Sequence, residues 1–407
     1  MAKKTLDRLD MKGKRVLVRV DFNVPLDDDR IITDDRRIRM AVPTIRCAMH
    51  AGGRVVLMSH LGRPKGKVEP KFSLKPAAVR LGELLECDVG FAPDCVGPAV
   101  EKMVADLADG QVLLLENLRF HAGEEKNDPG FARALCSLAD LYVNDAFGTA
   151  HRKHASTYGV PALMPEGTRA IGFLIEKELK FLGDALEKPK RPFVAVLGGV
   201  KVSDKIGVIE NLLGKVDRLL IGGAMAYVFM VARGEKTGKS KVEREVEKKG
   251  RKRDVIGEAK KLLKTIRSSG ADVCFPVDHL TGREFAADTD TDIQGPEMED
   301  GWIGLDIGPE TTELYREKLA DAKTVVWNGP MGVFEMAPFA VGSRAICEVL
   351  ARVAKEGTVV VGGGDTAAAV EKFGLAEQMT HISTGGGASL EFLEGRPFET
   401  ISVIDDA

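Results

Sequence analysis

Arg15-Val-Leu-Val-Arg-Val-Asp21 is a short apolar run that ends in polar residues. Nine similar runs follow, and each leads into turn residues and then a segment of helical period. This order is typical of parallel strands that are buried between crossover helices. The sequence therefore predicts an α/β fold with ten parallel strands, the other nine at residues 54–59, 112–115, 141–143, 193–197, 218–221, 272–277, 324–327, 358–361 and 380–383.

Ten strands are many for one open sheet, so we expect two sheets. The fold class is then two doubly wound, Rossmann-like domains joined by a helix, with a cleft between them. Residues 159–167 contain two prolines and two glycines and mark the expected boundary. A helix over residues 171–186 should join the domains. We expect the first domain to span residues 1–168 and the second to span residues 169–387.

Composition excludes several classes of protein. The 58 Lys and Arg nearly balance the 61 Asp and Glu, so no overall field would attract nucleic acid or a membrane surface. The longest uncharged apolar stretch, residues 219–232, is too short to span a bilayer, and the charged N-terminus does not resemble a secretory signal. The six cysteines include no C-x-x-C pair, which indicates reduced core thiols in a cytoplasmic protein.

The stretch over residues 233–254 contains ten basic and five acidic residues. It has no aromatic residues of the kind that accompany nucleic-acid patches. We interpret it as a solvated, partly helical insertion.

Cations follow the predicted strands in the first half of the chain. Ligands of open α/β sheets bind beyond the carboxyl ends of the strands. A single arginine there is usually a surface or helix-capping residue, but repetition at four tips favours a pocket for a small, doubly anionic ligand. The polar residues expected at this edge are Asp21, Asn23, Arg37, His60, Arg63, Arg119, His151 and Arg152.

Glycines follow the predicted strands in the second half. Between a strand and a helix, glycines let backbone N–H groups approach phosphate oxygens, so this half is expected to bind a nucleotide. For Gly222-Gly223, a tight turn without a ligand remains an equal alternative. The glycine-containing segments are residues 198–205, 222–223, 328–332, 362–366 and 383–389.

Two nucleotide motifs are nearly present. Residues 234–240 lack the spacing of a P-loop, and no strand precedes them. Residues 362–367 satisfy G-x-G-x-x-A, but glycines stand where the ribose-binding acid of an NAD-dependent dehydrogenase should follow, which disfavours that function. No histidine or cysteine spacing indicates a metal cage, whereas Asp365 could hold a Mg²⁺ carried by nucleotide phosphates.

Seven strings, in order, resemble the phosphoglycerate kinase family over nearly the whole chain. They are RVDFNVP from Arg19, SHLGRP from Ser59, ENLRF from Glu116, NDAFGTAHR from Asn144, LGGVKVSDK from Leu197, WNGPMGVFE from Trp327 and GGGDT from Gly362. Val200, where the family usually has alanine, and Ala224, where it has a third glycine, depart from the pattern on the adenine side.

The resemblance implies reversible phosphoryl transfer between ATP and the carboxylate of 3-phosphoglycerate, a step of glycolysis and gluconeogenesis, with Mg²⁺ on the nucleotide. It implies that the C-terminal tail, residues 388–407, returns to the first domain. The implied catalytic residues are Arg37, Lys201, Gly363 and Gly386. The residues that it implies bind 3-phosphoglycerate are Asp21, Asn23, Arg37, His60, Leu61, Gly62, Arg63, Arg119 and Arg152. Those for nucleotide are Lys205, Gly222, Glu335, Gly362, Gly363, Gly364, Asp365 and Thr366, with Asp365 also toward Mg²⁺.

A carboxylate nucleophile is already ionised at neutral pH, so the chemistry needs cations rather than a general base. Arg37 and Lys201 would supply them from opposite domains, which requires hinge closure. We expect a monomer that binds small molecules and no nucleic acid or membrane. The alternatives are a two-lobed binding protein without turnover, or an NAD-dependent dehydrogenase.

Overall fold

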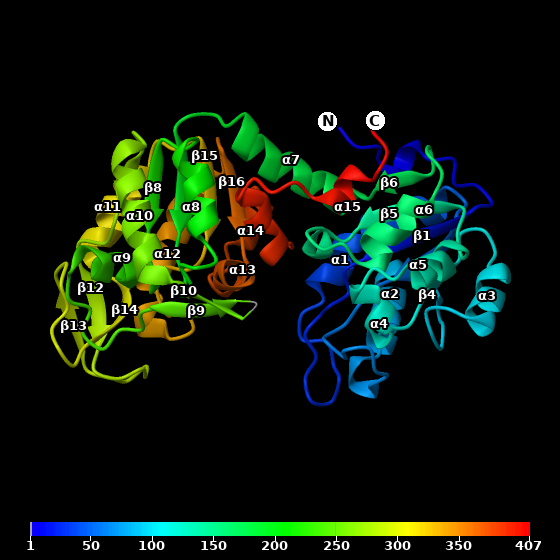
Figure 1. Cartoon of the computed structure of the whole chain (residues 1–407), viewed down its shortest axis with the longest axis horizontal. Coiled ribbons are helices and arrows are strands. Elements are labelled where there is room, and N and C mark those ends of the chain that lie inside the picture. Colours follow the sequence, from blue (N-terminus) through cyan, green and yellow to red (C-terminus); the bar gives the residue numbers. More distant parts are fainter. Residues whose placement is uncertain (1, 249) are drawn as a thin grey trace. The chain divides into compact units, whose positions relative to one another are not determined.

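The computed structural model describes residues 2–248 and 250–407. The chain folds into two compact units, Met1–Lys180 with Pro397–Ala407 and Phe181–Arg396. Each unit contains a six-stranded parallel sheet with helices packed around it (Figure 1). The predicted fold class of two parallel α/β domains is therefore confirmed.

The sheet of the first unit has the strand order β3-β4-β2-β1-β5-β6, and every neighbouring pair is parallel. Four of its strands were predicted: β1 (Arg15–Val20), β2 (Arg54–Met58), β4 (Val112–Leu114) and β5 (Leu141–Asp145). The edge strands β3 (Val89–Phe91) and β6 (Arg169–Ile171) were missed, because neither is an uninterrupted apolar run: β3 has a glycine at its centre and β6 begins with an arginine. Its helices are α1 (Arg36–His50), α2 (Lys75–Leu85), α3 (Pro98–Ala105), α4 (Ala122–Glu125), α5 (Pro129–Cys136), α6 (Val160–Leu163) and α15 (Glu399–Ser402).

The sheet of the second unit has the order β11-β8-β7-β15-β16-β17 and is also parallel. All six strands were predicted: β7 (Phe193–Leu197), β8 (Arg218–Ile221), β11 (Asp272–Cys274), β15 (Thr324–Asn328), β16 (Thr358–Gly362) and β17 (His381–Ile382). Its helices are α8 (Ile206–Leu213), α9 (Met225–Arg233), α10 (Val255–Ser268), α11 (Pro309–Leu319), α12 (Val341–Val353), α13 (Gly364–Lys372) and α14 (Gly387–Leu393).

Two small antiparallel sheets also belong to the second unit. One contains β12 (His279–Gly282), β13 (Thr291–Gln294) and β14 (Ile303–Ile307), and the other is the hairpin of β9 (Glu245–Lys248) and β10 (Arg251–Asp254). The expectation of partial helix in residues 233–254 was wrong, because the described residues after α9 form turns and this hairpin. Lys252 pairs with Glu247 in the register of this hairpin and also forms an ion pair with Glu245 at 3.8 Å, and opposite charges across strands favour pairing.

The helix expected at residues 171–186 is present as α7 (Phe173–Glu187), and the boundary between the units falls within it. We expected the boundary at residue 168, but β6 pairs with β5 and so belongs to the first unit. The tail from Pro397 packs on the first unit, where Lys4 N donates to Asp405 O at 2.8 Å. Leu393, by contrast, accepts a hydrogen bond from Asn211 in the second unit.

All six cysteines are free thiols. Cys95 and Cys347 are buried, but Cys87 is exposed, so the expectation of core thiols was wrong for Cys87, which lies just after the left-handed residue that ends α2. None of the helices in the described part of the chain combines the length and the apolar character that crossing a membrane requires.

Candidate functional site

Polar side chains of the first unit gather at one edge of its sheet. The strands β4, β2, β1 and β5 are parallel neighbours, so their carboxyl ends lie together. Asp21 follows β1, His60 follows β2, and Arg119 lies in a 3₁₀ turn after β4. Arg37, in the first turn of α1, donates from Nη1 to Asp21 Oδ2 at 2.8 Å. The structure thus brings together four residues that the sequence placed after three different strands.

Arg19 lies inside β1 and was not among the expected site residues, yet it is fully buried beneath the site. Its Nε donates to Ser156 Oγ at 2.9 Å, and its Nη2 donates to His60 Nδ1 at 3.2 Å. Ser156 in turn donates from Oγ to Oε1 of the fully buried Glu124 at 2.6 Å. These four residues, Glu124, Ser156, Arg19 and His60, form what we call the buried polar chain, and it fixes the His60 ring.

His60 is a neutral donor in this arrangement. Its pKa is lowered well below the ordinary value, first because the ring is buried and then because Arg19, Arg119 and Arg37 disfavour a further positive charge. The 3.9 Å contact between His60 Nδ1 and Asp21 Oδ1 is therefore not an ion pair. Since Nδ1 accepts from Arg19, Nε2 carries the proton and can donate to an anion.

Arg119 supplies a buried positive charge. It is 4% exposed, and its Nη1 donates to Gly62 O at 2.8 Å. Its Nη2 has no hydrogen-bond partner among the described residues. Burial lowers the pKa of Arg119, although a guanidinium remains protonated in proteins. Because a buried donor without a partner costs free energy, an anion at this edge would be stabilised there.

The loop after β2 supports Arg119. Gly62 N donates to Asn23 Oδ1 at 2.8 Å, and the φ of Gly62 is 61°, in the left-handed region. A Cβ at this position would also collide with the Phe72 ring, so glycine is required. The remaining expected residues of this loop differ in exposure: Leu61 is buried and Arg63 is exposed.

Arg152 is half-buried and lies after β5, where its Nε donates to His151 Nε2 at 3.0 Å. Within the described part of the chain, Arg152 forms no hydrogen bond with a residue of the buried polar chain. Arg63 and Arg152 are thus accessible to solvent, whereas Arg119 and His60 are buried.

The second unit builds its candidate site from loops whose backbones pack against one another. A Cβ on Gly223 would lie 2.5 Å from Gly199 N, and one on Gly222 would lie 2.5 Å from Met331 Sδ. A Cβ on Gly329 would collide with the backbone of Gly198. These glycines are needed for contact between the loops, so for Gly222-Gly223 the alternative of tight packing has direct support.

A cavity of about 460 Å³ lies among these loops and strand β14. Its wall is largely apolar, with Leu305, Met331 and Phe334 among the lining residues, and the expected residues Glu335 and Asp365 provide carboxylates. An apolar cavity of this size with a few polar groups is typical of a small-molecule site. Part of its wall comes from the antiparallel sheet that the sequence did not predict.

The two expected lysines lie in different environments. Lys201 is exposed and forms no ion pair with any residue that the structure describes. Lys205 is 8% exposed, and its pKa is lowered mainly by burial, against the opposing effect of Asp204, Asp365 and Glu243. A phosphate bound near Lys205 would offset the cost of that buried charge.

The segment after β16 begins α13 and contains five expected residues. Gly363 has a φ of 87° and is the N-cap of α13, while Gly364 and Asp365 are its first residues. Thr366 Oγ1 accepts from Gly329 N at 2.7 Å. Beside Gly362 and Gly363 lies Asn328 Nδ2, a buried donor without a partner among the described residues.

Asn328 was not among the expected site residues, and its place as the last residue of β15, before glycine, was the available signal. Gly386 lies apart from this segment, as the N-cap of α14, with a φ of 51° that favours glycine.

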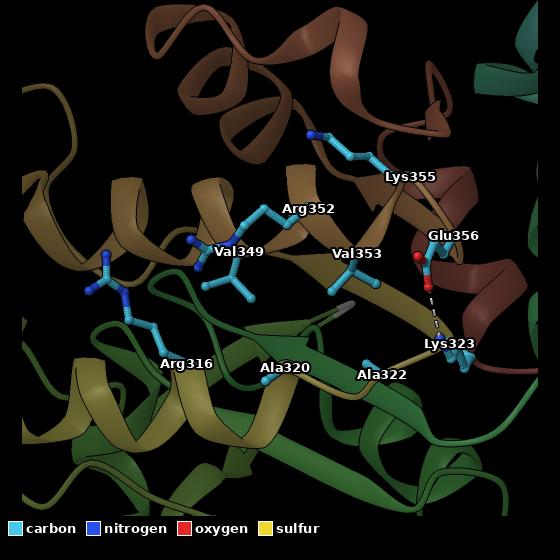
Figure 2. A pocket seen from close by; sticks show the side chains of 9 residues that line it. All are labelled: Arg316, Ala320, Ala322, Lys323, Val349, Arg352, Val353, Lys355 and Glu356. Carbon is cyan, nitrogen blue, oxygen red and sulfur yellow. Dashed lines mark hydrogen bonds and ion pairs between the residues drawn. The ribbon is translucent and has the colours of Figure 1, made fainter.

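Another hollow of the second unit, of about 360 Å³, contains none of the expected residues. It is lined by α11, α12 and the residues just before β15 and β16 (Figure 2). It therefore lies at the opposite edge of the sheet from the strands' carboxyl ends. Lys323 in this hollow is paired with Glu356 at 3.4 Å.

The chain is similar to known proteins over nearly its whole length. Residues 6–396 match the model of a family described as phosphoglycerate kinase. A phosphoglycerate kinase from Anaeromyxobacter sp. (strain Fw109-5) is 54% identical over the full length of both chains. A cytosolic phosphoglycerate kinase from Triticum aestivum is 53% identical over 99% of this chain and 98% of its own.

Among solved structures, that of phosphoglycerate kinase from Coxiella burnetii is similar to this chain with a TM-score of 0.85. The two sequences are 39% identical, and the match covers 98% of each chain.

Proposed function

The chain belongs to the phosphoglycerate kinase family, and from this premise we propose that its first unit binds 3-phosphoglycerate and its second unit binds Mg-ATP or Mg-ADP. It is an enzyme that transfers a phosphoryl group reversibly between ATP and a carboxylate. The proposal concerns which residues carry out each part of that reaction.

The observation that carries the assignment is the buried donor set of the first unit. Arg119 Nη2 is buried without a partner, and neutral His60 can donate from Nε2. A phosphate or carboxylate would satisfy both donors, whereas an uncharged ligand would leave the buried guanidinium uncompensated. Asp21, Asn23, Leu61, Gly62, Arg63 and Arg152 would complete this subsite.

The second unit would hold the nucleotide in the 460 Å³ cavity. Its apolar wall suits an aromatic base, and the Glu335 carboxylate can accept hydrogen bonds from ribose hydroxyls. Lys205, Asn328 and the backbone N–H groups at the start of α13 would face the phosphates. Gly222, Gly362, Gly363, Gly364 and Thr366 shape this phosphate-facing edge.

The residues of the second unit fit Mg²⁺ that arrives on the nucleotide. Asp365 is exposed on the cavity wall, and a nucleotide-bound Mg²⁺ needs only one or two protein carboxylates. We propose Asp365 as this ligand. The ion would neutralise part of the charge on the phosphates.

Phosphoryl transfer to a carboxylate depends on positioning and cations, because the nucleophile is already ionised at neutral pH. We assign the stabilisation of the transferring group to Arg37 and Lys201. Backbone N–H groups near Gly363 and Gly386 would add donors. Asp21 holds Arg37 by an ion pair of 2.8 Å, so the guanidinium is oriented before substrate binds.

Arg37 and Lys201 belong to different units, and both must contact one phosphoryl group. We therefore propose that hinge closure precedes transfer. Small-angle scattering of the apo, binary and ternary forms should show the smallest radius of gyration in the ternary complex. Equal radii in all three states would contradict closure.

A coupled assay for ADP formation from ATP and 3-phosphoglycerate tests the function. Activity that needs both substrates and Mg²⁺ is expected. Calorimetry of Arg119→Ala should show weaker 3-phosphoglycerate binding with unchanged Mg-ADP binding, and the reverse result would contradict the assignment of the units. A cytoplasmic monomer completes the proposal, and the cytosolic relative from Triticum aestivum supports that location.

A further inference from the structure

Three potential metal ligands of different kinds meet in the first unit, outside the residues assigned above. One ligand atom each from Asp94, Cys95 and His121 lies within 4.8 Å of the other two. Asp94 and Cys95 lie between β3 and α3, and His121 lies between β4 and α4. The long chain separation means that the fold, rather than a local turn, brings them together.

The trio shares protons in the absence of an ion. His121 Nε2 lies 2.7 Å from Asp94 Oδ1, the Cys95 backbone N–H donates to the same oxygen at 2.6 Å, and Cys95 Sγ lies within 4.8 Å of the other two ligand atoms. One carboxylate thus faces two groups that each offer a metal-binding atom. The Asp94 carboxylate would favour a bound cation.

We propose that Asp94, Cys95 and His121 form a binding site for Zn²⁺. The common bond lengths of zinc, about 2.3 Å to sulfur and about 2.0 to 2.1 Å to nitrogen and oxygen, imply ligand atoms about 3.3 to 3.6 Å apart in a tetrahedron. The present contacts range from 2.7 Å to no more than 4.8 Å, so small side-chain rotations suffice.

The coordination balances with one proton released. Zinc replaces the proton on Cys95 Sγ, which leaves to solvent, while neutral His121 moves its single proton from Nε2, where it faces Asp94, to Nδ1 and ligates through Nε2. Asp94 contributes one carboxylate oxygen. The Asp94 and His121 side chains are 48% and 32% exposed, so water can reach the fourth position.

The neighbouring structure orients the ligands. The His121 ring stacks on the Phe131 ring, with their centroids 5.0 Å apart. The backbone carbonyl oxygen of Asp94 accepts a hydrogen bond from Glu116 N at 3.3 Å. The site therefore joins the segment after β3 to the segment that carries Arg119. A bound ion should stabilise both against unfolding.

The test uses untagged full-length protein without nucleotide, titrated with Zn²⁺ against a chromophoric chelator, and separately with Co²⁺. We expect one Zn²⁺ per chain, an increase in thermal midpoint with zinc, and a thiolate-to-cobalt charge-transfer band. Cys95→Ser should abolish that band, and His121→Ala should weaken zinc binding by about 100-fold or more. The control Cys87→Ser removes an exposed thiol and should change neither result.

Stoichiometric binding that survives both Cys95→Ser and His121→Ala would overturn the proposal, as would the absence of stoichiometric binding in the unmodified chain. Because His121 is partly exposed, its variant keeps the test decisive if Cys95→Ser folds poorly.

Discussion

The two units prepare their polar groups in different ways. In the first unit, Arg19, His60 and Arg119 are buried and already held by hydrogen bonds. In the second unit, Lys201 and Asp365 are exposed. The first unit thus carries the cost of burying several charges when it folds, whereas the second buries Lys205 but leaves Lys201 and Asp365 in water.

This difference matters for catalysis because oriented charges stabilise a transition state without reorganisation. The buried polar chain gives the first unit that property. The glycine loops of the second unit are also rigid, because their backbones pack tightly, but the rigidity lies in the main chain. Substitutions of polar side chains should therefore have different effects on activity and stability in the two units.

The largest expected effect is on turnover. Arg37→Ala should lower kcat by roughly 10²-fold or more, about 3 kcal/mol, because it removes an oriented charge from the transferring phosphoryl group. Steady-state kinetics with both substrates varied would measure it. Arg39→Ala, on the same helix but paired with Asp35 in an exposed ion pair, is the control and should stay near the unmodified rate. Unchanged kcat with a raised KM for 3-phosphoglycerate would assign Arg37 to ground-state binding.

The buried polar chain should also be visible in stability. Glu124→Gln removes the buried carboxylate that accepts from Ser156, the residue that holds Arg19, and should destabilise the first unit by about 3 kcal/mol. Hydrogen exchange of β1 and β5 would report this, with β7 and β15 as internal references. The control Glu101→Gln changes an exposed carboxylate of α3 and should cost less than about 1 kcal/mol. Equal losses in the two variants would remove the distinction between the units.

Some of this could be predicted from the sequence. Ten of the twelve strands in the two parallel sheets were predictable, because each is an apolar run followed by turn residues. Strand β13 was not, because three of its four residues are exposed and it carries no apolar run. The charged hairpin β9-β10 was misread because a run of charges has no period that distinguishes strand from helix.

Part of the candidate site was equally predictable. Residues directly after the strands were found from the rule that ligands bind there. That rule missed three residues that are buried under the site, namely Arg19, Ser156 and Glu124. Arg19 and Ser156 are far apart along the chain, so their contact could not be predicted from the sequence. A charged residue in the middle of a buried strand was the one signal for Arg19.

Each unit contains a buried carboxyl group whose ionisation should make the stability of that unit depend on pH. Burial raises the pKa of Asp145 and of Asp306 to about 7. Asp145 accepts from Leu174 N at the start of α7, and Asp306 accepts from Gly342 N in α12. A carboxyl whose pKa is raised on folding contributes stability that is present below about pH 4 and is lost as pH rises through 7.

Relative to that of the unmodified protein, the free energy of unfolding of each variant, Asp145→Asn and Asp306→Asn, should therefore increase by about 2 kcal/mol between pH 5 and pH 7.5. Urea unfolding at each pH would measure the difference, with tryptophan fluorescence reporting the second unit, where Trp302 and Trp327 lie. Burial also lowers the pKa of His154 to about 3, so its contribution to stability is lost as pH falls below 6.5. His154 is present in both the variants and the unmodified protein, so its effect cancels in the difference between their free energies of unfolding. A difference independent of pH would show that the carboxyls are ionised throughout.

The smallest expected effect concerns an exposed group of the second unit. Glu335→Ala should weaken Mg-ADP binding by about fivefold, near 1 kcal/mol, because an exposed carboxylate exchanges hydrogen bonds with water for those with ribose. The affinity for 3-phosphoglycerate should not change. Calorimetry with each ligand measures both, and Glu377→Ala, away from the cavity lining, is the matched control. A loss of 100-fold or more for Glu335→Ala would mean that the second unit also depends on strongly oriented side-chain charge. In that case, the contrast between buried and exposed polar groups would not explain how the two units divide the work.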